Sequence, residues 1–499
     1  RMNSRARAYR YAILSLVLTA GLAACRPADS ESTPEAMPIA DDPALVLLDS
    51  VPVIMRRADV PGLQLAYMDS GQVTLTAAFG YANAESEMPV TDNTVFEAAS
   101  LSKPVFAYAV LRMVDRGEWD LDQPLWEVLE YERLAHDERA RDLTTRHVMT
   151  HTTGLPNWGG TPLEMNDAPG ERWGYSGEGF VYLQKAVEAA TGLSGEEIAT
   201  REVFEPLGMT DSHFVWVDAY EEQAAFRHDD LATPVGRSMP DETNAAASLL
   251  TTATDYSRFV VAVLDGEGLS EATRAALFEP GAALSTAAWG DDEEAMAHLF
   301  WGLGWGLQEG RRGDAFWHWG DNGASRCFVI AYPEDGSGLL YFTNSQNGLA
   351  IAPALVGLVF DDDQYSLRWM DYAPYDDPRR QARLRVTHAF VDLGVEAGAD
   401  AFDKEVANDP DLFDEGRVNS LGYVLLRRDA VDQAIWVFER NTIDYPESSN
   451  VWDSYGEGLR AAGRLEKSID MYRKAAELDP SNTNAVRFIE EMEAELASG

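Results

Sequence analysis

Apolar and polar residues alternate in paired runs near each end of the first 350 residues. The runs LQLAYM (63–68) and VTLTAAFGYAN (73–83) flank Asp69–Gln72, whose polar residues and glycine predict a hairpin turn. The runs SRCFVIAY (325–332) and GLLYFTN (338–344) repeat this pattern around a short break that contains Pro and Gly. Helical patterns and glycine-rich loops lie between the two pairs. This order predicts an α+β domain in which one antiparallel sheet, flanked by helices, is closed by the two ends of the domain.

A different pattern follows the polar, Pro-interrupted stretch at residues 371–380. The pairs that share a 34-residue spacing are Gly422 and Gly456, Ile435 and Ile469, Phe438 and Tyr472, and Pro446 and Pro480. This period resembles that of tetratricopeptide (TPR) repeats, which implies an all-α C-terminal repeat domain at 380–499. Two repeats leave apolar surface uncovered, so we expect residues 380–407 to stack on one end and a helix at 484–497 to cover the other. Such repeats imply a peptide or protein partner, or a structural role in buttressing the first domain.

The N-terminus has the layout of an export signal. Basic residues precede an apolar run at 12–24 that is too short to span a bilayer as a helix. The run ends in LAAC, which resembles a bacterial lipobox. The resemblance implies a lipoprotein signal peptide at 1–24, acylation of Cys25 and a location in the bacterial periplasm as a membrane-anchored lipoprotein. An ordinary signal peptide that contains a cysteine is the alternative. Residues 25–44 hold too little apolar matter to fold and are predicted to be a disordered tether.

The charge of the chain excludes some classes of partner. The chain has 83 acidic and 40 basic residues, a net charge of −43. Phosphate backbones and anionic lipid surfaces would repel it, so we expect no nucleic-acid partner and no membrane attachment beyond the lipid anchor. The second cysteine, Cys327, has no intrachain partner if Cys25 carries lipid. An exported chain of this length must then be stabilised by core burial, in a domain predicted at 45–370.

Lysine is scarce, and one lysine follows a serine by three positions. The chain has only five lysines in 499 residues. In the stretch Ser100-Leu101-Ser102-Lys103-Pro104, the proline suits the first turn of a helix, and an apolar helical segment follows. Residues three apart share a helix face, so Lys103 can reach the Ser100 hydroxyl. A hydroxyl is a weak nucleophile until a base removes its proton, and a buried neutral lysine supplies one.

Alone, this S-x-x-K motif is weak evidence, but further stretches agree with it in order and separation. Together they resemble the serine β-lactamase and penicillin-binding-protein superfamily, in its class C-like branch, over roughly residues 45–360. The stretches are LTTRHVMTHTTGLPNW (143–158), PGERWGYSGEGF (169–180), NAAASLLTTATDYSRF (244–259), WGLGWGL (301–307) and WHWGDNGASRCFVIAY (317–332). The resemblance implies a β-lactamase/transpeptidase-like fold with a helical subdomain.

The resemblance also implies roles for individual residues. Ser100 corresponds to the nucleophile, Lys103 to its helper and Tyr175 to the general base. A free tyrosine titrates near pH 10, so Tyr175 works as a base only beside a cation, which Lys103 supplies. Whether Tyr175 or Lys103 takes the proton stays open. The backbone N–H groups of Ser100 and Asp321 correspond to the oxyanion hole.

Two positions among the expected substrate-binding residues depart from the family's pattern. The asparagine that usually follows the tyrosine by two residues, and that binds an amide carbonyl, is Gly177 here. The strand motif His318-Trp319-Gly320 begins with histidine, where β-lactamases have a lysine that anchors a carboxylate. Histidine is mostly neutral above pH 6.5 and holds a carboxylate less firmly. Both departures predict weak or absent β-lactamase activity.

The sequence therefore predicts a serine hydrolase that forms an acyl-enzyme from an ester or amide. The substrate would be a small ester or a D-amino-acid peptide, as for an esterase, D-aminopeptidase or carboxypeptidase. The alternative is a non-catalytic protein that binds peptide or peptidoglycan and uses its repeats for interaction.

No cofactor is expected. His147 and His151 have a zinc-binding spacing but lack the acid that metalloprotease chemistry needs, so we expect a cap or turn role and no metal.

Overall fold

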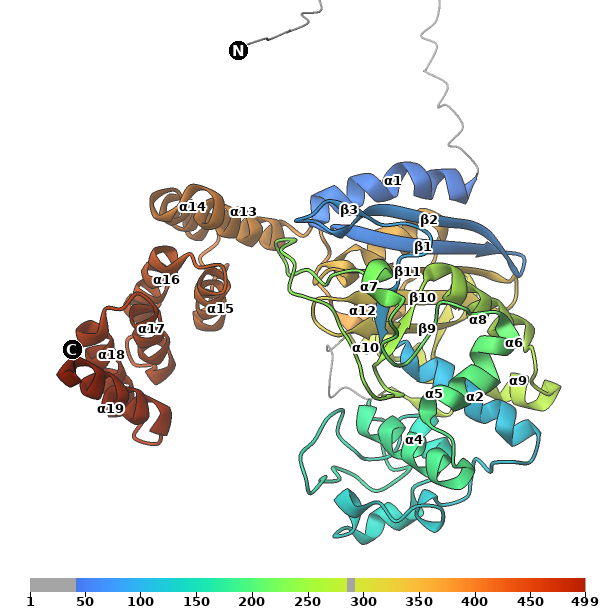
Figure 1. The fold of residues 1–499 in the computed structure, drawn as a ribbon. Helices are drawn as coiled ribbons and strands as arrows, with labels where there is room; N and C mark the ends of the chain where they lie inside the picture. Colours follow the sequence, from blue (N-terminus) through green and yellow to red (C-terminus); the bar gives the residue numbers. More distant parts are fainter. Residues whose placement is uncertain (1–41, 285–291, 499) are drawn as a thin grey trace, which may run out of the picture. The chain divides into compact units, whose positions relative to one another are not determined.

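A computed structural model describes residues 42–284 and 292–498 of the chain (Figure 1). The predicted signal peptide, the lipidation site at Cys25 and almost all of the predicted tether lie outside these residues. The first helix, α1 (Pro43–Ala58), includes the last two residues of the predicted tether, 43 and 44. Asp42 caps this helix by accepting a hydrogen bond from the amide of Ala44 at 3.0 Å.

The first predicted hairpin is confirmed. Strands β1 (Gly62–Asp69) and β2 (Gln72–Asn83) pair in antiparallel register. The two residues between them, Ser70 and Gly71, have φ angles of 54° and 73°. A two-residue turn with both central residues in the left-handed region matches the twist of the strands that it joins.

The sheet closes between the two ends of the domain, as predicted. Strand β1 pairs antiparallel with β11, the last strand of the second predicted hairpin. The nine strands have the order β3-β2-β1-β11-β10-β9-β8-β7-β6. The bounds of the remaining strands are β3 (Met88–Pro89), β6 (Ala282–Ala283), β7 (Leu299–Trp301), β8 (Gly306–Gly310), β9 (Gly313–Asp321), β10 (Arg326–Tyr332) and β11 (Ser337–Thr343).

Helices cover both faces of the sheet, and the alternation in β1 shows why. Leu63, Leu65 and Tyr67 belong to the core shared with α1, α11 (Ala352–Val359) and α12 (Tyr365–Met370). Ala66 and Met68 point to the other core, shared with α2, α4 and α8. The bounds of these three helices are Ser102–Asp115, Gly177–Thr191 and Ala253–Asp265.

A second, two-stranded sheet lies beside the first and leads into helix α2. It pairs β4 (Phe96–Ala99) with β5 (Leu249–Thr251). Short helices connect the rest of the domain. They are α3 (Thr145–Met149), α5 (Gly195–Ala199), α6 (Glu205–Leu207), α7 (Tyr220–Gln223), α9 (Glu271–Leu277), α10 (Glu293–Met296), the 3-10 turns Leu125–Glu127, Glu132–Leu134, Glu138–Asp142 and Gly348–Ile351, and the π turn Thr200–Phe204.

Between residues 378 and 498 all of the regular secondary structure is helical. These are α13 (Pro378–Leu393), α14 (Val395–Asn408), α15 (Glu415–Leu426), α16 (Val431–Asp444), α17 (Ser449–Ala461), α18 (Leu465–Leu478) and α19 (Thr483–Ser498). The 34-residue spacing has a packing cause. A Cβ on Gly422 would meet the Phe438 ring at 2.3 Å, and one on Gly456 would meet the Tyr472 ring at 3.0 Å. Each pair of helices therefore approaches closely at a glycine beneath an aromatic ring.

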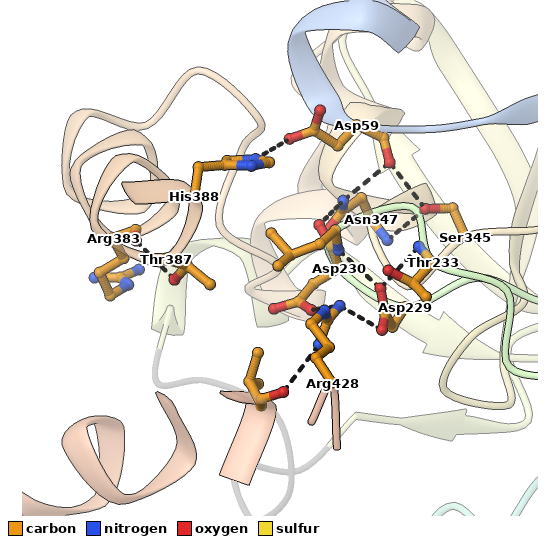
Figure 2. A network of polar contacts seen from close by, with 12 residues as sticks. Asp59, Asp229, Asp230, Thr233, Ser345, Asn347, Arg383, Thr387, His388 and Arg428 are labelled. Carbon is orange, nitrogen blue, oxygen red and sulfur yellow. Dashed lines mark hydrogen bonds and ion pairs between the residues drawn. The ribbon is translucent and has the colours of Figure 1, made fainter. Parts of the chain in front are cut away.

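Polar contacts join the sheet domain to the C-terminal helices (Figure 2). Arg428 forms an ion pair with Asp229, and the His388 imidazole lies 3.4 Å from the Asp59 carboxylate. Asn347 supports this side of the sheet domain by donating to the backbone carbonyl of Asp59 at 3.2 Å. Within residues 42–284 and 292–498, no helix has both the length and the apolar character needed to cross a membrane.

Candidate active site

Ser100 lies at a strained corner between strand β4 and helix α2. Ala99, the last residue of the strand, has a φ of 48°, which an L-alanine adopts only at a cost. The side chain of Ser102 holds this corner, because its hydroxyl donates to the carbonyl of Ala99 at 2.6 Å and accepts from the amide of Leu249 at 2.9 Å. The Ser100 side chain, half-buried, is thereby presented at the start of the helix.

Lys103 is buried directly behind Ser100. Its ammonium group donates to the Ser100 hydroxyl at 3.0 Å and to the carbonyl of Ala246 at 2.8 Å. Burial lowers the pKa of Lys103 well below that of a solvent-exposed lysine, because removal from water penalises the charged form. No carboxylate contacts this ammonium among the described residues, so nothing offsets that penalty.

Tyr175 completes the cluster from the loop just before helix α4, whose N-cap residue is Ser176. Its hydroxyl is hydrogen-bonded to Ser100, and the Lys103 Nζ atom lies 4.6 Å from its ring centroid. The backbone after it is fixed by His151, whose Nδ1 accepts from the amide of Ser176 at 3.1 Å. Burial raises the pKa of Tyr175 far above 10. The structure thus brings together the three side chains that the sequence analysis singled out.

The predicted strand motif lies on β9, and its glycine allows the strand to approach the nucleophile corner. A Cβ on Gly320 would lie 2.5 Å from the carbonyl oxygen of Ala98 and 2.4 Å from the Cys327 sulfur. Any side chain at position 320 would therefore push β9 away from β4. Asp321 follows, and its amide is the second expected oxyanion donor.

The carboxylate of Asp321 is held by a residue from outside the predicted motifs. It accepts from the Tyr372 hydroxyl at 2.6 Å and lies 3.0 Å from the Arg326 guanidinium. The Arg326 guanidinium also lies over the Tyr372 ring, 5.1 Å from its centroid. Tyr372 belongs to the segment that leads to the C-terminal helices, so that segment reaches the edge of the site.

His318 is fully buried and neutral. Its Nδ1 donates to the carbonyl of Trp319 at 2.7 Å, and burial together with nearby Lys103 lowers the pKa of His318 to about 3. The neighbouring tryptophans Trp301 and Trp317 are also buried. A buried neutral imidazole offers no positive charge to a substrate carboxylate.

The Beta-lactamase family model matches residues 50–361, the part of the chain that contains this cluster. The chain belongs to this family. Penicillin-binding proteins and an esterase are among the proteins similar to this chain. The general class is therefore that of serine hydrolases with the β-lactamase fold. The C-terminal helices lie beyond the matched region.

Individual members of the family are similar over part of the chain. Penicillin-binding protein 4 of Amycolatopsis lactamdurans is 26% identical over 322 residues, which cover 58% of this chain and 82% of that protein. Esterase EstB of Burkholderia gladioli is 32% identical over 198 residues, which cover 33% of this chain and 50% of EstB.

Solved structures share the fold at lower identity. The D-alanine carboxypeptidase AmpC from Burkholderia cenocepacia aligns with a TM-score of 0.53 and 18% identity, and the alignment covers 64% of this chain and 99% of that one. The octameric penicillin-binding protein homologue from Pyrococcus abyssi aligns with a TM-score of 0.54 and 21% identity, over 69% of this chain and 81% of that one.

Gly177, where the β-lactamase-like pattern usually has asparagine, is covered by a tryptophan that the sequence analysis missed. A Cβ on Gly177 would lie 2.7 Å from the Trp158 ring. The Gly177 amide donates to Asn157 Oδ1 at 3.0 Å, which fixes the loop that carries Trp158. Trp158 is 51% exposed, so it presents an aromatic surface beside the site. The sequence feature that could have indicated this cover is the pair Asn157-Trp158, which ends the stretch 143–158.

The two histidines with zinc-binding spacing have different positions. His147 caps helix α3 together with Thr144, which confirms the expected cap role. His151 is buried, has a φ of 52° and packs 4.3 Å from the Tyr175 ring. Its contact with Tyr175 was not foreseen, because sequence spacing gives no information on packing across loops.

Proposed function

We propose that this protein is an esterase that acts on small, uncharged carboxylic esters through an acyl-enzyme at Ser100. The observation that carries the proposal is the contact of the Ser100 hydroxyl with both Lys103 and Tyr175 in a buried setting. Burial of Lys103 favours its neutral amine, the form that can accept the proton of the Ser100 hydroxyl.

Lys103 is the group that we propose takes the proton. Burial lowers the pKa of Lys103 and raises that of Tyr175, so the amine loses its proton far more readily than the phenol. As the Ser100 oxygen bonds to the ester carbon, its proton moves to the Lys103 nitrogen. When the carbon–alkoxide bond breaks, the Tyr175 hydroxyl donates to the leaving oxygen and is reprotonated from Lys103. Water then reverses these steps to release the acid.

The carbonyl oxygen becomes negatively charged in the tetrahedral intermediate. We propose that the backbone N–H groups of Ser100 and Asp321 stabilise it. The close approach of β9 to β4 at Gly320 supports this assignment, because it keeps the two amides on neighbouring backbones. The contacts of Tyr372 and Arg326 with the Asp321 carboxylate hold this end of β9 in place.

The preference for uncharged esters follows from what surrounds the cluster. His318 is neutral and buried, so it supplies no charge for the carboxylate of a β-lactam or of a peptide C-terminus. Trp158 occupies the space above Gly177 where an asparagine side chain would meet an amide. An apolar acyl group suits an exposed indole better than a peptide amide does. The 32% identity to a protein named as an esterase supports the same class.

Hydrolysis of 4-nitrophenyl butyrate, with fluorophosphonate labelling and mass mapping, tests the proposal. We expect the label on Ser100, and loss of turnover in Ser100→Ala and Lys103→Met. Lys185→Met is the matched control, because Lys185 forms a surface ion pair with Glu188 at 3.0 Å. Label on another residue, or wild-type turnover in Ser100→Ala, would refute the assignment.

The pH profile tests the choice of base. A base must be unprotonated, so kcat/KM should rise with pH as Lys103 loses its proton. Because burial lowers the pKa of Lys103, this rise should lie well below the value near 10.4 of a free lysine. A profile that rises only at the pH of phenol ionisation would assign the base to Tyr175 instead.

Export, acylation of Cys25 and attachment to a membrane stay predictions from the N-terminal pattern. Metabolic labelling with a fatty-acid analogue in cells, with Cys25→Ser as the control, tests them. The non-catalytic alternative predicts binding of peptide or peptidoglycan fragments without any Ser100-dependent hydrolysis, so the same ester assay decides between the two.

A further inference from the structure

A small pocket lies between helices α13 and α15 and the loop that carries Asp230. It has a volume of about 230 Å³, and three arginines line it: Arg380 and Arg383 from α13, and Arg417 from α15. The chain as a whole has about twice as many acidic as basic residues, 83 to 40. Three cationic side chains around one small pocket are therefore an unusual local concentration of positive charge.

Arg383 faces this pocket without a counterion. Among the described residues its guanidinium makes no hydrogen bond or ion pair, whereas other arginines of the same helix are paired. Arg379 lies 2.7 Å from Asp409, and Arg385 lies 3.0 Å from Glu405. Burial, and then the neighbouring charge of Arg417, lower the pKa of Arg383, and the more weakly acting carboxylates of Asp377 and Asp414 offset this only in part. An unpaired guanidinium held near another one is unfavourable unless an anion joins them.

Arg380 has unused hydrogen-bonding capacity in the same place. Its Nη2 donates to Asn347 Oδ1 at 2.7 Å, but its Nε atom is buried and lacks a partner among the described residues. Burial lowers the pKa of Arg380 as well. Arg417 pairs with Asp414 on its own helix turn, and this pair is solvent-exposed. The pocket thus offers free N–H donors from at least two guanidinium groups.

Besides the arginines, Asp230, Thr387 and Ser420, the lining includes apolar side chains that select among anions. Leu384, Phe413 and Val424 form part of the wall. An inorganic ion would leave this surface unused, whereas an organic anion with an aliphatic or aromatic group would bury it. Asp230 also lines the pocket, and its carboxyl group disfavours a ligand with two negative charges. The fork of an arginine matches a carboxylate with two parallel hydrogen bonds.

We propose that this pocket binds a carboxylate that carries an apolar group, with Arg383 as the principal anchor. Two sources supply this chemistry: a free carboxylic acid, and the C-terminal carboxylate of a peptide that ends in an apolar residue. Figure 2 shows Arg383 and Thr387 on the helix that borders the pocket and Asp230 on the sheet domain. A ligand here would contact both parts of the protein at once.

Titration calorimetry on the full-length protein with Ser100→Ala tests the proposal without turnover. The probes are phenylacetate, the peptide acetyl-Ala-Ala-Phe as the free acid, the same peptide as its C-terminal amide, and inorganic phosphate. We expect binding of an acid and at least tenfold weaker binding of the amide and of phosphate, because a hydrogen bond to a charged group is worth about a tenfold factor or more. Tighter binding of phenylacetate or of the peptide acid identifies the source.

Arg383→Gln should weaken the binding of the acid by about tenfold or more. Arg385→Gln is the matched control, since Arg385 lies on the same helix but pairs with Glu405 outside the pocket. Arg383→Gln should leave the melting temperature unchanged or raise it, because no partner is lost and the repulsion from Arg417 is removed. Equal affinity of the two variants, binding of the amide as tightly as the acid, or a large loss of stability in Arg383→Gln would overturn the proposal.

Discussion

Gly320→Ala tests whether the close approach of β9 to the nucleophile corner sets the activity. In the structure an added Cβ would lie 2.5 Å from the Ala98 carbonyl oxygen, 2.4 Å from the Cys327 sulfur and 3.2 Å from the Ala99 Cβ. Two of these neighbours are backbone or rigid atoms of β4, which ends one residue before Ser100. The strain can therefore be relieved only by moving one strand away from the other.

The expected losses of activity and stability in Gly320→Ala follow from these distances. Ordinary carbon–oxygen contacts are about 3.3–3.6 Å, so the strands must separate by about 1 Å. Overpacking of this kind destabilises a folded protein by about 1–3 kcal/mol. A displacement of about 1 Å at a catalytic site costs about 100-fold in rate. We therefore expect Gly320→Ala to lower kcat/KM by about 100-fold and the unfolding free energy by about 2 kcal/mol.

Two measurements on the same samples separate the effects. Ester hydrolysis gives kcat/KM, and urea denaturation at 25 °C gives the unfolding free energy. Gly160→Ala is the control, because a Cβ there meets no atom within 4 Å. If Gly320→Ala keeps wild-type kcat/KM, the close approach of β9 to β4 does not position the reacting groups. The assignment of Asp321 to the oxyanion hole then fails as well.

Three further predictions concern single side chains. Tyr175→Phe keeps the ring packing but removes the hydroxyl that contacts Ser100, so kcat should fall about 100-fold or more while the melting temperature stays within a few degrees of wild type. Arg428→Ala leaves Asp229 largely buried without its counterion, and urea denaturation should show a loss of about 3 kcal/mol; a loss below about 0.5 kcal/mol would mean that the pair is not formed in solution. The pKa of His388 is raised, chiefly by its hydrogen bond to Asp59, so the stability that this pair supplies is complete below the unfolded-state pKa near 6.5 and is lost as pH rises through the raised value. His388→Gln should remove this pH dependence from the urea midpoint between pH 6 and pH 9, and an unchanged dependence would contradict the pairing.

The sheet and the repeats could be predicted from sequence because their signals are local or periodic. Alternation with period two around the polar stretch Asp69–Gln72 predicted the first hairpin. The structure adds that this alternation places residues of β1 in two different cores. The 34-residue spacing identified Gly422 and Gly456, and the structure explains it through the aromatic rings that pack on them. In both cases a packing requirement, a buried side chain or a glycine under a ring, recurs at a fixed spacing along the chain.

The parts of the site that were missed depend on contacts between distant segments. Trp158 and Gly177 are separated by a loop, and only the folded chain shows that one excludes a side chain at the other. The complete burial of His318 could not be read from its motif, because a histidine on a strand reads the same whether it faces solvent or a cluster of tryptophans. Tyr372 lies in a Pro-interrupted polar stretch whose composition indicates a linker and gives no sign of a bond to Asp321.

The hydrogen bond from Tyr372 to Asp321 has a practical consequence for protein engineering. The family match ends at residue 361, yet the phenol of Tyr372 contacts the strand motif. A fragment cut at the family boundary would lack this phenol, and any drop in its activity would be credited wrongly to the missing repeats. A minimal version of the enzyme should therefore extend through residue 377, so that only the helices are removed.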